Sequence, residues 1–187
     1  MQVRLVVFGR QGAGKGTQCA LLAERYGVPH ISTGDMLRAA LSEGSPVGME
    51  AKPFMDRGAL LPDDIMIRLI DERLHASDAE HGFLLDGFPR TLGQAEALLD
   101  LLGDGIDAAI DIDVPLDVVK ERMQLRARSD DTPDAIAARL AAYEDDTVPA
   151  IEHFDEADLL IRVDGLGEID EVFGRITTVV DERISVA

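Results

Sequence analysis

The chain has 187 residues, and 46% of them are hydrophobic, but no apolar run reaches the roughly 18 residues that a transmembrane helix requires. Its 36 acidic and 18 basic residues give a net charge of −18, and a surface of that sign repels nucleic acids and acidic membranes. The single cysteine, Cys19, excludes an intramolecular disulfide and a multi-cysteine zinc site, so we expect no structural zinc. No export signal is visible, and we expect a cytoplasmic protein with Cys19 as a small buried residue of the first helix.

Short apolar runs alternate with helical segments along the chain. Strands are predicted at Val3–Phe8, Pro29–Ser32, Gly82–Asp86, Ala108–Asp113 and Asp158–Val163. Helices are predicted at Gly14–Tyr26, Thr91–Leu102, Thr132–Phe154 and Glu168–Ile184. In the third of these, Thr132 is the predicted N-cap and Pro133 the first helical residue. The alternation predicts an α/β fold, a five-stranded parallel sheet with helices on both faces, formed by residues 1–187 as one domain.

Residues 33–75 are predicted to form one helix after another, with breaks at Gly44-Ser45-Pro46 and at Gly58–Pro62. This stretch is too long for a simple crossover between neighbouring strands. We therefore expect a helical insert that lies over the C-terminal edge of the sheet.

A glycine-rich run, Gly9-Arg10-Gln11-Gly12-Ala13-Gly14-Lys15-Gly16-Thr17, separates the first predicted strand from the first helix. This is the layout of a phosphate-binding loop, in which glycines let backbone N–H groups point inward and the helix N-terminus adds positive charge. Lys15 would bring a full charge to the outer phosphates of a nucleoside triphosphate. The general pattern has Ser or Thr directly after the lysine, but here Gly16 follows Lys15 and the hydroxyl is at Thr17. This difference argues against the commonest signalling and motor NTPases.

Two other interpretations of this loop are weaker. A dinucleotide-binding turn needs Gly or Ala at position 17, where Thr17 stands, and it gives Lys15 no role. A turn that only joins a strand to a helix does not account for the lysine in register with the glycines.

Asp86-Gly87-Phe88-Pro89-Arg90 follows the third predicted strand. Ligand chemistry in α/β sheets is placed at the carboxyl ends of strands, so Asp86 is positioned to orient the water shell of Mg²⁺ and Arg90 to bind a phosphate. The alternative is an ordinary strand end in which Asp86 caps the next helix.

Two further groups of polar residues call for explanation. Thr33, in Ser32–Arg38, is a possible helix N-cap, a role that needs no ligand. Four arginines lie among acidic residues, and two of them, Arg122 and Arg126, share a helix face, where they repel unless an anion lies between them. The alternative is a solvated face with ion pairs to Glu121, Asp130 and Asp131. The four are Arg122, Arg126, Arg128 and Arg139.

Together, Gly12–Gln18, Ser32–Arg38 and Asp86–Thr91 resemble the three signatures of the adenylate kinase family, in the family's order and spacing. The resemblance covers essentially the whole chain and implies a P-loop NTPase fold that transfers the γ-phosphate of Mg·ATP to AMP, giving two ADP. It implies a helical AMP-binding insert at 32–61 and a short lid at 126–132. It also implies Mg²⁺ as cofactor, nucleotides as the only partners, and a monomer. The alternatives are a kinase for UMP, CMP or GMP, or a non-enzymatic ATP-binding module.

The resemblance also assigns roles to individual residues. The ATP-binding residues would be Gly12, Ala13, Gly14, Lys15, Gly16, Thr17 and Arg122. The AMP-binding residues would be Thr33, Arg38, Leu61, Gly87, Arg90, Gln94, Arg128 and Arg139. The catalytic residues would be Lys15, Arg90, Arg126, Arg128, Arg139 and Asp86. Asp86 would hold magnesium through bound water with no direct protein ligand, Asp35 would help to organise the site, and Phe88-Pro89 would be a cis peptide.

The chain departs from the family pattern at two places. Gln11 stands where the family usually has proline, which predicts a less rigid start to the loop. Only Ala127 separates Arg126 from Arg128, so the longer lid of many relatives is absent and the short-lid form is expected. Relatives that act on UMP and CMP usually differ at the positions of Thr33 and Gln94, so these two residues favour AMP.

The excess of acidic residues has two explanations. The first is an ordinary solvated surface, and the second is adaptation to high salt, which screens the repulsion between like charges. The second explanation predicts a melting temperature that rises between low and molar KCl, measured by circular dichroism. A flat or falling melting temperature would rule it out.

Overall fold

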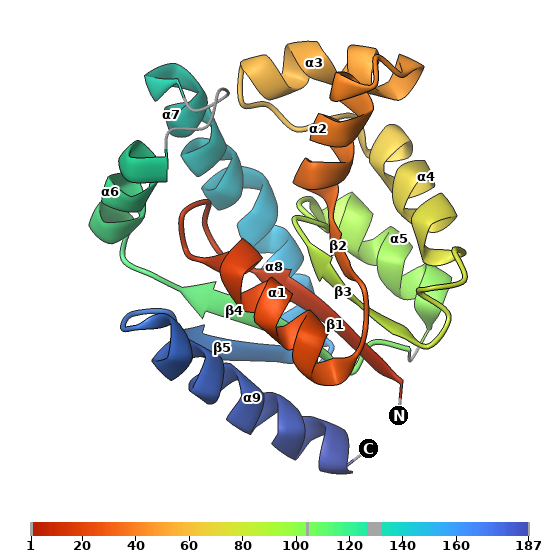
Figure 1. The fold of residues 1–187 in the computed structure, drawn as a ribbon, viewed down its shortest axis with the longest axis vertical. Coiled ribbons are helices and arrows are strands. Elements are labelled where there is room, and N and C mark those ends of the chain that lie inside the picture. Colours follow the sequence, from red (N-terminus) through yellow and green to blue (C-terminus); the bar gives the residue numbers. More distant parts are fainter. Residues whose placement is uncertain (1, 104, 127–131, 187) are drawn as a thin grey trace.

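The computed structural model describes residues 2–103, 105–126 and 132–186. Its centre is a five-stranded parallel sheet in the order β2-β3-β1-β4-β5 (Figure 1). The strands are β1 (Val3–Phe8), β2 (His30–Ser32), β3 (Gly82–Asp86), β4 (Ala108–Asp113) and β5 (Leu160–Asp164). The predicted fold class is confirmed, and each predicted strand is present with its ends shifted by two residues at most.

Helices connect the strands. They are α1 (Lys15–Tyr26), α2 (Thr33–Ser42), α3 (Pro46–Asp56), α4 (Asp63–Leu74), α5 (Leu92–Leu102), α6 (Leu116–Arg126), α7 (Pro133–Ala142), α8 (Val148–Glu156) and α9 (Ile169–Val186). None of the helices in the described part of the chain is both long and apolar enough to cross a bilayer.

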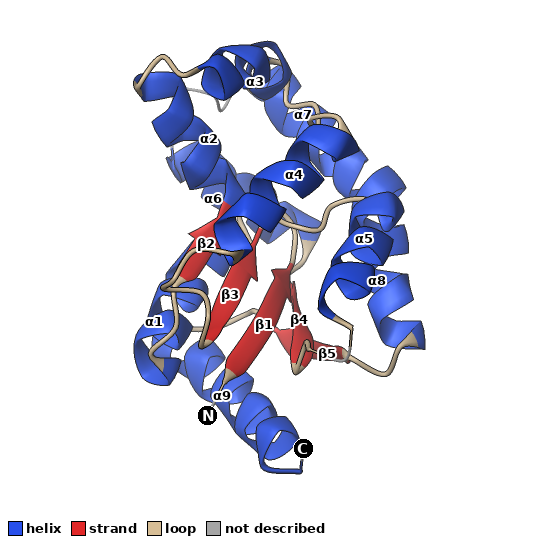
Figure 2. Ribbon diagram, turned by 90° about the vertical axis from the view of Figure 1, so that its right-hand side faces the viewer, coloured by secondary structure: helices blue, strands red, loops and turns tan. Residues whose placement is uncertain are grey.

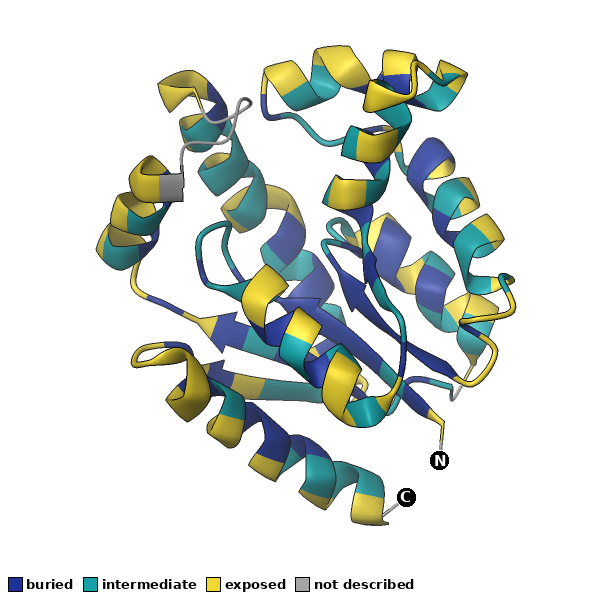
Figure 3. Cartoon of the chain, viewed as in Figure 1, coloured by how far each residue is buried: buried dark blue, intermediate teal, exposed yellow. Residues whose placement is uncertain are grey.

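Both faces of the sheet are buried, which explains why its strands are apolar without alternation. Val6 and Phe8 of β1 face a core with α4, α5 and α8, whereas Leu5 and Val7 face a core with α1, α6 and α9. Figure 2 shows these two groups of helices on opposite sides of the sheet, and Figure 3 shows buried strands beneath helices whose outer faces are exposed. The two cores hold the carboxyl ends of the strands in fixed positions.

The strand order brings separate parts of the sequence together at one edge of the sheet. Val7 of β1 is in register with Asp86 of β3, and Ser32 of β2 is in register with the same aspartate. The segments that follow β1, β2 and β3 therefore start side by side. Helices α2 and α3 rise from this edge, away from the sheet (Figure 1).

Two predictions about helices need correction. The predicted helix Thr132–Phe154 is three segments, because a π-helical stretch, η1 (Tyr143–Thr147), separates α7 from α8. The Thr132 cap and Pro133 are confirmed, with the Thr132 hydroxyl accepting from the N–H of Ala135. The cap of α2 is Ser32 and not Thr33, because the Ser32 hydroxyl accepts from the N–H of Asp35. The predicted lid, 126–132, lies mostly outside the described residues.

Substitution of Phe154 in α8 tests the packing of the core that contains Phe8 of β1. The Phe154 side chain is fully buried and meets the ring of Phe8 edge to face, with centroids 5.4 Å apart. We expect Phe154→Ala to lower the free energy of unfolding by about 3–5 kcal/mol, because it leaves a cavity in a packed core. Urea denaturation would measure this. Leu125→Ala, at a side chain with 79% exposure, should change it by less than about 0.5 kcal/mol, and equal losses in both variants would contradict the assignment.

Candidate functional site

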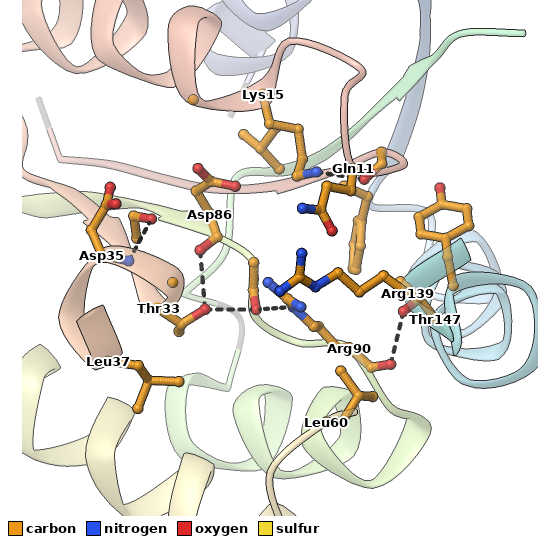
Figure 4. Close-up of a pocket in the computed structure, with 18 of the residues that line it drawn as sticks. Gln11, Lys15, Thr33, Asp35, Leu37, Leu60, Asp86, Arg90, Arg139 and Thr147 are labelled. Carbon is orange, nitrogen blue, oxygen red and sulfur yellow. Dashed lines mark hydrogen bonds between the residues drawn. The ribbon is translucent and has the colours of Figure 1, made fainter. Parts of the chain in front are cut away.

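A cleft of about 690 Å³ opens at the carboxyl edge of the sheet, within the range of roughly 300–1,000 Å³ common for small-molecule sites. Its lining comes from the glycine-rich loop, the start of α2, the Gly58–Leu61 loop, the end of β3, and helices α6 and α7. Figure 4 shows Lys15, Asp86, Arg90 and Arg139 pointing into this cleft from different elements. Segments far apart in sequence thus contribute to one site.

The loop between β1 and α1 has the conformation that its glycines predict. Gly12 has a φ of 92°, and a Cβ there would lie 2.8 Å from the carbonyl oxygen of Val119, so only glycine fits. Lys15 Nζ donates to the carbonyl oxygens of Gly9 (2.7 Å) and Arg10 (3.1 Å), so its charge lies over the loop. Gly14, Gly16 and Thr17 line the cleft, whereas the Ala13 side chain packs into the core. The loop presents a helix N-terminus and a cation to the same space, which suits an anionic ligand.

Asp86 lies at the bottom of the cleft, where β3 ends. Its Oδ2 is 3.2 Å from Nε2 of His30. Burial opposes its ionisation, but the hydrogen bond with His30 and the charge of Lys15 outweigh burial and hold the pKa of Asp86 below its usual value. The carboxylate is therefore ionised at neutral pH, which suits it to accept hydrogen bonds from the water shell of a cation. No helix cap is formed by Asp86, since the hydroxyl of Thr91 caps α5.

The turn after Asp86 aims Arg90 into the cleft. The Phe88-Pro89 peptide is cis, as predicted. Arg90 Nε donates to the carbonyl oxygen of Gly87 at 2.8 Å, and the Thr33 hydroxyl donates to the same oxygen at 2.9 Å (Figure 4). A Cβ on Gly87, which has a φ of 80°, would lie 2.8 Å from both the Thr33 hydroxyl and Arg90 Nη2. This close packing joins the start of α2 to the turn and fixes the direction of the guanidinium group.

Three arginines reach this part of the cleft from different elements. Burial lowers the pKa of Arg90, Asp86 raises it, and the charges of Arg139 and Arg38 lower it further. Arginine stays protonated under such influences, so the three positive charges repel one another. Arg38 also pairs with Asp35, and Arg139 Nη2 donates to the carbonyl oxygen of Met55 at 3.3 Å. Such a group of cations has a natural counterpart in a multiply charged anion.

The other predicted arginines have different positions. Arg122 lines the cleft beside the loop, and its Nη1 lies 3.5 Å from the carbonyl oxygen of Ala13. Arg126 is the last residue of α6, but its side chain is not described, and Arg128 lies outside the described residues.

Gln94 lines the cleft with its side chain buried, and both the oxygen and the nitrogen of its amide make hydrogen bonds. Its Oε1 accepts from the N–H of Arg90 at 2.8 Å, and its Nε2 donates to Asp63 Oδ1 at 2.7 Å. Asp63 also accepts from the Thr91 hydroxyl at 2.9 Å. Leu61, two residues before Asp63, lines the cleft with its side chain almost completely buried. These contacts orient the amide at the side of the cleft next to α2 and α4.

Arg10 makes several contacts at the start of the loop, next to Gln11. Its Nε and Nη2 lie 2.9 and 2.8 Å from Glu144 Oε1, and its Nη1 lies 3.4 Å from Asp113 Oδ1. The guanidinium carbon lies 5.1 Å from the ring centroid of Tyr143. The π-helical stretch that carries Tyr143 and Glu144 ends with Thr147, whose hydroxyl donates to the carbonyl oxygen of Arg90 at 3.0 Å. π-helical turns are often found at functional sites, and this one connects the loop to the Arg90 turn.

Sequence reasoning missed four residues of this site: His30, Asp63, Tyr143 and Thr147. His30 belongs to none of the motifs described above, yet it lies against Asp86. Asp63 carries one signal, its place after Pro62 at the start of a predicted helix. The contacts of the other three join residues that are 32 or more positions apart, so spacing alone could not reveal them.

Comparison with known proteins gives consistent matches. The sequence matches the family model described as Adenylate kinase over residues 7–159. It is 49% identical to an adenylate kinase of Nocardia farcinica over 173 residues, which cover 91% of this chain and 94% of that protein. It is 48% identical to an adenylate kinase of Corynebacterium glutamicum over 176 residues, covering 92% and 96%. It is 46% identical to an adenylate kinase of Xylella fastidiosa over 181 residues, covering 93% and 97%.

The contacts of Arg10 yield a prediction for stability. We expect Arg10→Gln to lower the free energy of unfolding by about 1 kcal/mol, because it removes a partly exposed ion pair and the contact with Tyr143. Thermal denaturation should show a fall in melting temperature of about 2–4 °C. Arg162→Gln is the control, since Arg162 makes an exposed pair with Asp155 and, among the described residues, contacts no aromatic ring. An equal fall in the melting temperature of Arg162→Gln would show that the contacts of Arg10 add no specific stability.

Proposed function

The chain belongs to the adenylate kinase family and is a phosphotransferase with AMP as acceptor, and we propose that its cleft holds ATP at the glycine-rich loop and AMP beside α2. The observation that carries this proposal is the position of Lys15 and Arg90. Lys15 approaches from the loop, Arg90 approaches from the β3 turn, and both line one continuous cleft. Two phosphate groups bound there would meet between these residues.

On the ATP side, the loop would bind the phosphates through its backbone N–H groups and Lys15. Gly12, Gly14, Gly16 and Thr17 lie where the triphosphate would pass. The Ala13 side chain faces the core, so its contribution would come from the backbone. Arg122, beside the loop, would lie against the adenine base.

On the AMP side, Arg38 and Arg90 would bind the AMP phosphate, and Gln94 would hydrogen-bond the adenine. Thr33 and Leu61, which both line the cleft, would form the walls near the base, and Gly87 permits the close approach of Thr33 and Arg90. For Gln94 to reach adenine, its amide would exchange its bond with Asp63 or with the N–H of Arg90. We assign α2, α3 and the loop up to residue 61 to the AMP-binding insert.

Transfer requires alignment of two phosphates and neutralisation of their charge, and the acceptor needs no catalytic base because a phosphate oxygen is already anionic at neutral pH. Arg90 and Arg139 would lie at the transferring group, and Arg126 and Arg128 would close over it as a short lid. Closure would exclude water, which otherwise would hydrolyse ATP.

Asp86 fits a role toward Mg²⁺. Its carboxylate is ionised, lies at the bottom of the cleft, and faces Lys15 across the loop. Mg²⁺ keeps several waters and takes few protein ligands when it binds with nucleotide phosphates. We assign Asp86 to the magnesium-bound waters, and the ion would supply positive charge to the triphosphate.

We also infer a monomer located in the cytoplasm, in which all residues of the site come from one chain. Support comes from the cleft, whose described lining is complete from the loop to α7 without a second copy. Light scattering coupled to size-exclusion chromatography measures the mass directly, and a dimer would contradict the inference.

The reaction is tested by measuring ADP formation from Mg·ATP with AMP, UMP, CMP, GMP or no acceptor. We expect two ADP per ATP consumed with AMP, and almost none without acceptor. A preference for another monophosphate would overturn the assignment of the base, and equal turnover with and without acceptor would indicate an NTPase.

Lys15→Met should lower kcat by at least a hundredfold, about 3 kcal/mol, because it removes a preorganised charge from the transferring phosphates. Lys120→Met is a matched control, since Lys120 is an exposed lysine of α6 that does not line the cleft. A Lys15→Met enzyme that keeps more than a tenth of the wild-type rate would refute the role.

Gln94→Asn should raise the KM for AMP by about tenfold and leave the KM for ATP within about twofold, because the shorter amide loses its reach to the base. Asp63→Ala should shift the same constant in the same direction, since it removes the acceptor that orients Gln94. Gln124→Asn, on an exposed part of α6, serves as the control. Equal changes in both KM values would contradict the AMP assignment.

A further inference from the structure

Three side chains at the base of the cleft lie close together, and the proposed reaction uses only one of them, Asp86. Cys19 on α1, His30 at the start of β2 and Asp86 at the end of β3 place Sγ, a ring nitrogen and a carboxylate oxygen within 4.8 Å of one another. In the described part of the chain they are the one trio of His, Cys, Asp or Glu ligand atoms this close together. Cys19 is fully buried, whereas His30 and Asp86 line the cleft.

From this arrangement we propose that Cys19, His30 and Asp86 form a binding site for a thiophilic divalent cation such as Zn²⁺ or Cd²⁺, and that its occupation inhibits the enzyme. Thiolate, imidazole and carboxylate are the three ligand types that zinc takes in proteins. A fourth position would face the cleft, where water or a phosphate oxygen could complete a tetrahedron.

The distances are close to what such a site needs. Bonds of about 2.0 Å to nitrogen and oxygen and about 2.3 Å to sulfur place tetrahedral ligand atoms roughly 3.3–3.6 Å apart. His30 Nε2 and Asp86 Oδ2 are already 3.2 Å apart. The sulfur lies within 4.8 Å of both atoms. Side-chain movements of about 1 Å would therefore bring all three ligand atoms to bonding distance of one cation. The cation would bridge the present hydrogen bond between His30 and Asp86.

The chemistry of the three residues separates this site from the magnesium site. Mg²⁺ prefers oxygen ligands and retains its waters, so it does not recruit the sulfur. Burial and the nearby charge of Asp86 raise the pKa of the Cys19 thiol, so without a metal the thiol is neutral and unreactive. Binding replaces the thiol proton, which leaves to solvent, and the Nε2 proton that His30 now shares with Asp86, which moves to Nδ1 or leaves to solvent so that Nε2 can bind the metal.

A bound cation would engage the carboxylate that the proposed function assigns to magnesium-bound water, and the inhibitory part of this inference rests on that assignment. Cation binding itself does not rest on it, because the ligand atoms are close together irrespective of the reaction.

Binding is tested on the untagged full chain, without nucleotide or magnesium. Isothermal titration calorimetry with ZnCl₂ measures stoichiometry and affinity, and the absorption spectrum with Co²⁺ reports whether a thiolate is a ligand. We expect one Zn²⁺ per chain and a thiolate-to-cobalt charge-transfer band. Cys19→Ala should weaken Zn²⁺ binding at least tenfold and remove the band. Cys19→Ser, close in volume to cysteine, repeats the test if the alanine variant is less stable.

A surface pair provides the matched control. His75 Nδ1, on the exposed C-cap residue of α4, lies 3.3 Å from Asp71 Oδ1 of that helix. No cysteine is nearby, so His75→Ala should leave both measurements unchanged. Equal Zn²⁺ binding by the wild type and both Cys19 variants, or no binding at all, would overturn the site.

Inhibition is measured as ADP formed from Mg·ATP and AMP, quantified by chromatography so that no coupling enzyme meets the metal. Enzyme loaded with Zn²⁺ should lose at least about tenfold in rate, and Cys19→Ala under the same conditions should keep its rate. Full activity with Zn²⁺ bound would overturn the inhibitory part. An enzyme inactive even without Zn²⁺ would instead count against the proposed function, so the two failures are distinguishable.

Discussion

The convergence of a few cations on one cleft is the feature on which the proposed site depends, because the chain as a whole repels anions. Its net charge is −18, and only 18 of its residues are basic. Lys15, Arg38, Arg90, Arg122 and Arg139 nevertheless line one cleft. The sheet order makes this possible, since it places the ends of β1, β2 and β3 side by side. Local concentration of positive charge thus offsets the field of the surface.

Most of the cations that line the cleft are oriented by hydrogen bonds to the backbone. Lys15, Arg90, Arg122 and Arg139 each donate to a backbone carbonyl oxygen. A carbonyl oxygen orients a cation and leaves its formal charge unchanged. Arg38 of the cleft pairs with the carboxylate of Asp35, and the surface arginines Arg25, Arg73 and Arg162 also pair with carboxylates. Arg10 also pairs with carboxylates, and there the ion pairs hold the start of the loop.

Much of this could be predicted from local sequence. The strands were predictable because apolar runs bounded by glycine or polar residues mark buried parallel strands, and the loop because its glycines and lysine have fixed spacing. The π-helical stretch was not, because Tyr143–Thr147 contains no glycine or proline that would mark a break in the predicted helix. Ser32 and Thr33 offer adjacent hydroxyls, and only the fold decides that Ser32 caps α2 while Thr33 bonds to the β3 turn. The contacts of His30 with Asp86 and of Asp63 with Gln94 join distant segments, so they needed the tertiary structure.

The central claim is that one cleft holds two nucleotides with their phosphates meeting between Lys15 and Arg90. The most direct test is calorimetric binding of a bisubstrate analogue in which a polyphosphate chain joins two adenosines. We predict one analogue per chain, bound more tightly than ATP or AMP alone, and displaced by either nucleotide. Binding no tighter than that of ATP, or displacement by ATP but not by AMP, would contradict the account.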